Sequence, residues 1–355
     1  MLRIVAVGTV LAALTIAATA TFTQAQDAKK YTLGLPIAAG STFVVADGLE
    51  AFKKEGLNVK TEYFAEVSMT RKALLTGQVQ FASIGLGPLL QADALGADLK
   101  MIAVTEYSFT DKAGKSWEST ALVAPPAKNI KSLQDLKGKK LGIDSFGSTY
   151  YVAFTDKLRK EGIDPKTITM VTVPWTQLGG ALVTGQIDAA IMFVTDIERT
   201  RERMPLDRVM TEFEYTGVRT SVTTGIVAKA SWLKNNRDAA LGVLRAYLKT
   251  REFMRKDRVE NDGKFTREQL NAYMKAGPEV ADLYYKIRGG YAGLELDYVN
   301  YLEVPRDSVE AYNKLLVEGN SLQGKPPVSF EQAVDTELLK EAYKQVELTW
   351  IDHGN

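Results

Sequence analysis

Two short Gly-Ser-Thr segments carry the hydroxyl groups best suited to bind a ligand. They are Gly40-Ser41-Thr42 and Gly147-Ser148-Thr149. Ser and Thr are typical residues at the start of a helix, where backbone N–H groups are unpaired and the helix dipole is positive. Such a turn can bind a small anion without a lysine or arginine. It can also serve only to cap its helix, so both roles stay open for each hydroxyl.

Other turns at matching places along the chain add polar and aromatic side chains. Aromatic residues could hold an apolar or aromatic ligand body, although they more often belong to a core. Arg219 could pair with a carboxylate or sulfonate, or it could be a solvated arginine. The candidate ligand contacts are Ser41, Thr42, Phe43, Ser68, Gly85, Gly87, Ser145, Phe146, Ser148, Thr149, Trp175, Phe193, Thr195 and Arg219.

The residue counts exclude most catalytic chemistry. The chain has no cysteine and one histidine, His353, which is third from the C-terminus. A cysteine nucleophile, a thiolate zinc site and a disulfide are therefore impossible, and a catalytic imidazole would be poorly placed. Gly114-Lys115-Ser116 lacks the earlier glycine of a phosphate loop, because Phe109 stands there. No carboxylate pair or metal-ligand spacing stands out, so we expect no enzyme, no cofactor and no metal.

The first 25 residues have the pattern of an export signal. Arg3 precedes an apolar run from Ile4 to Ala20, and Thr23-Gln24-Ala25 offers small residues to a signal peptidase. We predict cleavage after Ala25 and a periplasmic mature protein. A retained membrane anchor is the alternative, but a span needs about 20 strongly apolar residues. The absence of cysteine also excludes a lipoprotein anchor.

The charge balance argues against nucleic acid and membrane surfaces as partners. Lys and Arg total 44 and Asp and Glu total 43, and loss of Arg3 with the leader makes the mature chain formally neutral. A neutral chain has no general electrostatic attraction to polyanions. Any charged ligand must therefore be bound by local groups.

The chain repeats itself at a spacing of about 107 residues, which is the size of a domain. Leu33-Gly34-Leu35 and Gly40-Ser41-Thr42 recur as Leu141-Gly142-Ile143 and Gly147-Ser148-Thr149. Lys54–Leu57 and Ala73–Val79 recur as Lys160–Ile163 and Ala181–Ile187. Four blocks in one order indicate two similar lobes.

Within each lobe the pattern alternates between strands and helices. Short apolar segments predict strands at Tyr31–Leu35, Val79–Ile84, Lys140–Ile143 and Ile187–Val194. Gly56, Gly77, Gly162 and Gly185 stand where helices end. Repeated strand–helix–strand units predict an α/β fold with a mostly parallel sheet, flanked by helices, in each lobe. Ligands of such sheets bind beyond the carboxyl ends of the strands.

Two segments are expected to join the lobes as a two-strand hinge. Ala124-Pro125-Pro126-Ala127 predicts an extended crossing, and the β-rich Thr220–Ala228 predicts the return. The remainder is largely helical, with helices expected at Ala239–Lys256 and Glu331–Val346. The predicted organisation is a leader at 1–25, lobe I at 26–124 and 224–355, and lobe II at 125–223.

Several longer segments resemble a known family. They are Ala73–Gly85, Leu95–Ala103, Ser132–Ile143 and Gly185–Ala190. They are similar to the periplasmic solute-binding proteins of ABC importers, in the nitrate/sulfonate/taurine-type group with the type II periplasmic binding protein fold. One departure is Gln80, where the group commonly has an acid, as the second lobe does at Asp188. We expect that position to brace a strand end.

The resemblance implies a protein that closes two lobes around a solute and presents the closed form to an ABC permease with its ATPase. The group's ligands include sulfonates, nitrate, taurine, small organic acids and neutral pyrimidine precursors. Together with the aromatic turns, this favours a small organic anion, a sulfonate or carboxylate with an apolar or aromatic body.

Two alternatives remain. One is a binding protein for a neutral pyrimidine-type precursor, and the other is an enzyme on the same fold, related to pyrimidine synthases. Those synthases use an active-site histidine, and this chain offers only His353. We expect a monomer that binds no nucleic acid and is not stably inserted in a membrane.

Overall fold

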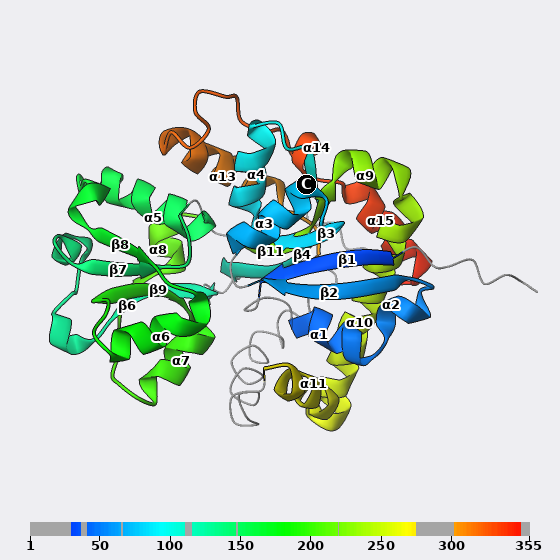
Figure 1. Cartoon of the computed structure of the whole chain (residues 1–355), viewed down its shortest axis with the longest axis horizontal. Coiled ribbons are helices and arrows are strands. Elements are labelled where there is room, and N and C mark those ends of the chain that lie inside the picture. The colour runs from blue at the N-terminus through cyan, green and yellow to red at the C-terminus, as the bar shows by residue number, and fades with distance from the viewer. Residues whose placement is uncertain are drawn as a thin grey trace, which may run out of the picture.

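The computed structural model describes residues 30–36, 41–64, 67–110, 116–146, 148–218, 220–274 and 302–348. These residues form two α/β lobes that lie side by side (Figure 1). We call the part built on a six-stranded sheet lobe I and the part built on a five-stranded sheet lobe II. The predicted leader and His353 lie outside the described residues.

Lobe I has the strand order β2-β1-β3-β11-β4-β5. Strand β1 is parallel to β2 and β3, whereas β11 is antiparallel to β3 and β4. The strands are β1 (Lys30–Pro36), β2 (Asn58–Phe64), β3 (Phe81–Ile84), β4 (Leu99–Thr110), β5 (Ser116–Trp117) and β11 (Thr220–Lys229). The N-terminal helices are α1 (Ser41–Gly48), α2 (Ala51–Lys54), α3 (Val67–Thr76) and α4 (Leu86–Ala94).

Lobe II has the order β10-β6-β9-β7-β8, in which β7 is parallel to β8 and β9. Its strands are β6 (Thr120–Ala124), β7 (Lys140–Ile143), β8 (Thr169–Thr172), β9 (Ala189–Phe193) and β10 (Asp207–Thr211). Its helices are α5 (Thr149–Lys160), α6 (Trp175–Val183), α7 (Val194–Arg201) and α8 (Glu212–Thr216), with 3-10 turns at Pro126–Lys128, Leu133–Leu136 and Pro165–Thr167.

The internal repeat corresponds to a repeated structural unit. Strands β2-β1-β3 of lobe I and β8-β7-β9 of lobe II have the same order and direction. The central strands carry Gly34 and Gly142, where a Cβ atom would lie 3.3 Å from a methyl of Val79 and 2.5 Å from a methyl of Ile187. Glycine is needed there because the following segment packs directly on the strand. The prediction of two similar α/β lobes is confirmed.

The residues that follow the second helix of each repeat brace the central strand, as predicted. The Oε1 atom of Gln80 accepts a hydrogen bond of 2.8 Å from the Thr32 N–H. The Oδ2 atom of Asp188 accepts one of 2.9 Å from the Lys140 N–H. Gln80 of lobe I therefore makes the same hydrogen bond to the strand as Asp188 of lobe II. This position has a structural role in both lobes.

The sheets are mixed rather than mostly parallel, because strands near the hinge run against the repeat. The first crossing lies between β5 and β6, at Glu118 and Ser119, since β6 already pairs with β9 in the sheet of lobe II. It precedes the predicted crossing at Ala124–Ala127, because Pro125 and Pro126 start a 3-10 turn after β6 instead. The predicted return segment is strand β11, which lies entirely in the sheet of lobe I.

The described residues of the C-terminal third are largely helical and pack mainly on lobe I. Its helices are α9 (Ala230–Asn235), α10 (Arg237–Asn261), α11 (Lys264–Met274), α13 (Arg306–Glu318), α14 (Phe330–Ala333) and α15 (Thr336–Gln345). The single helix predicted at Glu331–Val346 is broken, because Val334 is extended and bridges Met101 of β4. The Asp335 N–H donates to the Met101 carbonyl at 3.0 Å, and the Asp335 side chain caps α15.

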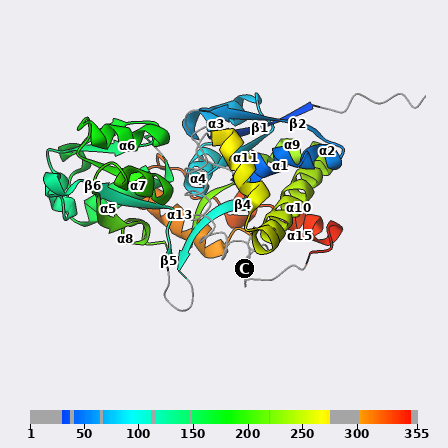
Figure 2. The same cartoon turned by 90° about the horizontal axis from the view of Figure 1, so that it is seen from below.

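Helix α13 lies between the lobes (Figure 2). It contacts α4 and β11 of lobe I and α5 of lobe II. Its Glu318 pairs with Lys160 of α5 at 2.7 Å. One apolar core extends across both lobes, and a second lies between the lobe I sheet and α1, α10 and α15. Among the described residues, no helix is long and apolar enough to cross a membrane.

Candidate functional site

Three parallel strands of lobe II end side by side at the edge where the sheet fold is expected to bind ligands. The central strand β7 is followed by Asp144 and Ser145. Strand β8 leads within a few residues to Trp175, the first residue of α6, and β9 ends at Phe193. The structure therefore brings the predicted polar and aromatic turns of lobe II to one edge.

A carboxylate that sequence reasoning missed is central to this edge. The Ser148 hydroxyl donates to Oδ1 of Asp144 at 2.7 Å, and the Ser145 hydroxyl donates to Oδ2 at 3.2 Å. Exposure is 7% for Asp144, 7% for Ser145 and 6% for Ser148. Burial raises the pKa of Asp144 to about 6, and hydrogen bonds from Ser148 and Ser145 oppose that rise. Asp144 therefore titrates closer to neutral pH than an exposed aspartate does.

Ser148 caps helix α5, and its hydroxyl is already engaged. Its Oγ accepts a hydrogen bond from the Tyr151 N–H at 3.2 Å while donating to Asp144. The two serines predicted to donate to an anion instead donate to Asp144. The negative charge at the α5 N-terminus is therefore supplied by the chain itself. The signal in the sequence was the acid directly after the strand.

The two lobes touch where α5 and α4 begin. A Cβ atom added at Gly85 or at Gly87 would lie 3.0 Å from Oγ1 of Thr149. Gly85 precedes α4 in lobe I, and Thr149 is the first residue of α5 in lobe II. Because both glycines lack a side chain, the two helix starts can approach directly. The structure brings together Gly85, Gly87 and Thr149, which were all candidate ligand contacts.

The Thr149 hydroxyl is buried without a hydrogen-bond partner among the described residues. Thr149 is only 5% exposed. A buried polar group that lacks a partner destabilises the folded state, and such a group often marks a place for water or a ligand. The Tyr150 side chain, in the same helical turn, is likewise buried, and its hydroxyl interacts with Thr223.

Three aromatic rings form a compact cluster at the same edge. The Trp175 and Phe193 ring centroids are 4.3 Å apart, and Tyr150 meets Trp175 edge-on at 5.8 Å. Tyr150 also meets Phe193 edge-on at 6.3 Å. Trp175 and Phe193 were predicted, whereas Tyr150 was not. Together the rings form an apolar wall beside the α5 N-terminus.

The remaining candidates in lobe II lie apart from this cluster. Phe146 is 57% exposed and meets Tyr151 edge-on at 5.3 Å. Thr195 is half-buried in the first turn of α7. Arg219 lies outside the described residues, so its proposed pairing with a ligand stays a prediction.

Candidates in lobe I occupy helix starts or the core. Ser41 and Thr42 begin α1, and Ser68 is the second residue of α3. Phe43 is fully buried, and its ring lies 4.9 Å from that of Tyr247 in α10. Its place in the lobe I core leaves it no surface for a ligand, so we omit it from the proposed contacts.

A second buried carboxylate joins the hinge segments. Oε2 of Glu212 accepts hydrogen bonds from the Ser108 hydroxyl at 2.8 Å and from the Ser119 and Thr120 N–H groups at 3.0 Å. Glu118 in turn accepts a 2.8 Å bond from the Glu212 N–H. Burial raises the pKa of Glu212 to about 7, against those hydrogen bonds. Glu212 thereby links β4, the first crossing and α8.

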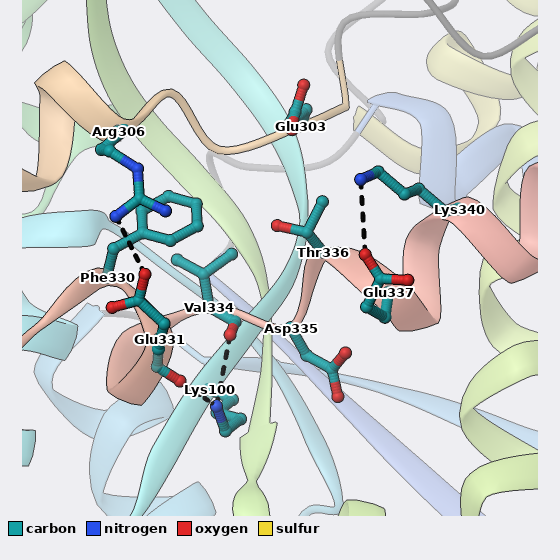
Figure 3. A pocket seen from close by; sticks show the side chains of 10 residues that line it. All are labelled: Lys100, Glu303, Arg306, Phe330, Glu331, Val334, Asp335, Thr336, Glu337 and Lys340. Carbon is teal, nitrogen blue, oxygen red and sulfur yellow. Dashed lines mark hydrogen bonds and ion pairs between the residues drawn. The ribbon is translucent and has the colours of Figure 1, made fainter. Parts of the chain in front are cut away.

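A pocket of about 420 Å³ opens in lobe I between the start of α13 and helices α14 and α15 (Figure 3). Four of the charged groups around it form ion pairs within the chain. Arg306 pairs with Glu331 at 3.0 Å and lies over Phe330, and Lys340 pairs with Glu337 at 3.3 Å. Lys100 donates to the Val334 carbonyl at 3.2 Å. These contacts hold the C-terminal helices on the edge of β4, and we assign the pocket no ligand.

The described residues contain no cluster of three or more His, Cys, Asp or Glu side chains able to hold a metal ion. The groups that the lobe II edge presents are hydroxyls, a carboxylate and aromatic rings. They suit non-covalent capture of a small molecule.

Comparison with known proteins places this geometry among two-lobed binding proteins. The family described as NMT1/THI5 like matches residues 40–260. A binding protein of Brucella abortus is 26% identical over 165 residues, which cover 46% of this chain and 47% of that protein. The taurine-binding periplasmic protein of Escherichia coli is 26% identical over 174 residues, covering 49% of this chain and 50% of that protein. The chain spans about half the length of the curated relatives it matches.

The fold as a whole matches solved structures more extensively. The alkanesulfonate-binding protein SsuA from Xanthomonas axonopodis, bound to MOPS, superposes with a TM-score of 0.63 at 15% identity. That match covers 86% of this chain and 98% of SsuA. The predicted fold, two α/β lobes of the periplasmic binding protein type, is confirmed.

Proposed function

The chain belongs to the NMT1/THI5-like family, and from this premise we propose that it is the solute-binding component of an ABC-type importer. It captures a small organic molecule between its two lobes and delivers it to a membrane permease driven by an ATPase. The leader at residues 1–25 supports export to the periplasm. The binding proteins among its relatives and structural neighbours support binding rather than catalysis.

The observation that carries the proposal is the contact between Thr149 of lobe II and Gly85 of lobe I. It joins the strand-end turns of two matched lobes, where a bound solute would touch both. Contacts to both lobes stabilise the closed form relative to an open one, and a permease can recognise that difference.

The family resemblance favours an organic anion as the ligand, with a neutral pyrimidine-type precursor as the alternative. An anion at the α5 N-terminus would lie against the Asp144 carboxylate, and its expected donors Ser145 and Ser148 already donate to that group. The geometry therefore weakens the anion prediction at this helix end. It leaves capture of a small solute intact.

Thermal unfolding with a panel of solutes tests the function. The panel contains alkanesulfonates, taurine, nitrate, aromatic carboxylates, pyrimidines and aromatic amines. A ligand at 100 times its dissociation constant stabilises the protein by about 2.7 kcal/mol, a readily measured rise in Tm. No response to any solute, together with no small molecule in native mass spectra of protein from periplasm, would contradict the proposal.

A further inference from the structure

We propose that Asp144 selects a ligand that presents a protonated nitrogen, such as an amine or amidine on a flat apolar body. The inference rests on the proposed function and names the chemical class of its solute. It replaces the organic anion predicted from the sequence. Four features of the lobe II edge carry it.

The first feature is the neutral character of every group that contacts Asp144. The carboxylate receives hydrogen bonds from the hydroxyls of Ser145 and Ser148, and no cation contacts it among the described residues. Within the described residues, neutral donors leave the buried carboxylate without a cationic partner. Buried charges in proteins are normally paired, so a ligand cation would complete this site.

The second feature is independent of the acid. Thr149 is 5% exposed, and its buried hydroxyl, without a partner in the described part of the chain, faces Gly85 and Gly87 of lobe I. Thr149 is the first residue of helix α5. The preceding residue, Ser148, caps this helix and donates a hydrogen bond to Asp144. A hydroxyl oxygen accepts hydrogen bonds, so ligand N–H groups directed at Asp144 could also reach Thr149.

The third feature is the sign of the charge toward the hinge. Glu106, Glu118 and Glu212 are all buried there, at 5%, 7% and 0% exposure. Glu212 and Glu106 act together with burial to raise the pKa of the Tyr150 hydroxyl. Arg208 is the basic group that acts on Glu118. Two of these acidic side chains, Glu212 and Glu106, therefore act on the first turn of α5 at Tyr150.

The fourth feature is the aromatic cluster of Tyr150, Trp175 and Phe193, at the same edge of the lobe II sheet as Asp144. Aromatic faces attract cations and flat apolar bodies. A carboxylate beside aromatic rings is a combination that favours an organic cation over an organic anion of the same shape.

Three probes of nearly one shape test the charge preference. Benzamidine is a cation, benzamide is neutral and benzoate is an anion at neutral pH. Calorimetric titration of the full mature chain is expected to give benzamidine a Kd at least about tenfold below that of benzamide. Benzoate is expected to bind weakest. Equal affinities, tighter binding of benzoate, or no binding of benzamidine overturns the proposal.

Variants assign the preference to one residue. Asp144→Asn keeps the size of the side chain and its acceptor for Ser148, and it is expected to abolish the advantage of benzamidine over benzamide. The control Asp207→Asn removes the same charge from an exposed position of lobe II and is expected to change nothing. An unchanged preference in Asp144→Asn, with Tm confirming that it folds, overturns the role of Asp144.

The two hypotheses fail separately. A response to sulfonates or carboxylates in the solute panel, with no preference for benzamidine, would overturn the charge inference and leave solute binding in place. If neither the panel nor the three probes bind, solute capture itself fails.

Discussion

The Oγ1 atom of Thr149 lies 3.0 Å from the position that a Cβ atom of Gly85 would occupy. One residue starts a helix of lobe II and the other precedes a helix of lobe I, so this contact joins the lobes. Asp144 lies in the same lobe II turn, hydrogen-bonded to the residue before Thr149. The contact between the lobes and the carboxylate proposed to recognise ligand charge therefore lie next to each other.

A methyl group at this contact should oppose closure. In Gly85→Ala the new Cβ would meet Thr149 Oγ1 at 3.0 Å and the Thr223 carbonyl oxygen at 2.9 Å. Overpacking of this kind costs about 1–3 kcal/mol. We expect solute affinity to fall about tenfold or more, measured by calorimetry.

The matched control for that variant is Gly180→Ala in helix α6, where an added Cβ has no neighbour within 4 Å. Alanine should stabilise that helix by about 0.5–1 kcal/mol and leave affinity unchanged. Equal affinities of the Gly85→Ala and wild-type proteins would show that the contact has no part in binding.

Ser148→Ala separates capping from ligand binding. The hydroxyl caps α5 through the Tyr151 N–H and donates to Asp144, so its loss should lower the free energy of unfolding by about 1–2 kcal/mol. Affinity for benzoate or a sulfonate should not fall, because in the proposed site the hydroxyl donates to Asp144 rather than to an anion. Weaker anion binding with unchanged stability in urea titrations would support the anion site instead.

Stability should increase on mild acidification. Burial raises the folded-state pKa of Asp144 to about 6, above the ordinary value of 3.8. Between these values the folded protein holds a proton that the unfolded chain has lost, so unfolding becomes harder as pH falls. Ionised Asp144 lowers the free energy of unfolding by its full amount when the pH is above the folded-state pKa. This loss disappears when the pH is below the unfolded-state pKa. It amounts to about 3 kcal/mol.

Urea unfolding of the wild type and Asp144→Asn between pH 5 and pH 8 measures this effect. The variant should be more stable at pH 8, and its stability should vary less with pH. Burial raises the pKa of Glu212 to about 7. In both proteins, Glu212 therefore also makes the free energy of unfolding increase as pH falls. Parallel curves for the two proteins would contradict the assignment to Asp144.

The hinge carboxylate offers a test of its structural role. Glu212→Ala leaves the Ser119 and Thr120 N–H groups without their buried acceptor, which should cost about 3 kcal/mol or more of unfolding free energy. Glu212→Gln keeps an acceptor oxygen and should cost much less. Chemical denaturation measures both, and equal losses would mean that the two hydrogen bonds to Glu212 do not hold the hinge.

Much of the fold could be predicted because the chain repeats itself. Gly34 and Gly142 occupy the same place in the two lobes, and each is needed for a segment to pack on its central strand. Local sequence patterns were enough to predict these features. The break in the C-terminal helix could not be predicted, because it depends on the long-range bridge between Val334 and Met101.

The site was predicted only in outline. The pattern located the helix starts but gave no direction for individual side chains. Phe43 faces the core and Ser148 faces Asp144, and both outcomes depend on packing between distant segments. Asp144 was visible in the sequence, but its significance comes from burial and from the absence of a cation beside it among the described residues.

Ligand-driven closure of the lobes is the central claim, and a distance across the lobes tests it most directly. The chain has no cysteine, so Lys53→Cys in lobe I and Lys166→Cys in lobe II give two specific spin-label sites. Pulsed electron resonance should show a broad distribution without solute and a narrower, shifted one with a solute that binds in calorimetry. An unchanged distribution at saturating solute would contradict capture between the lobes.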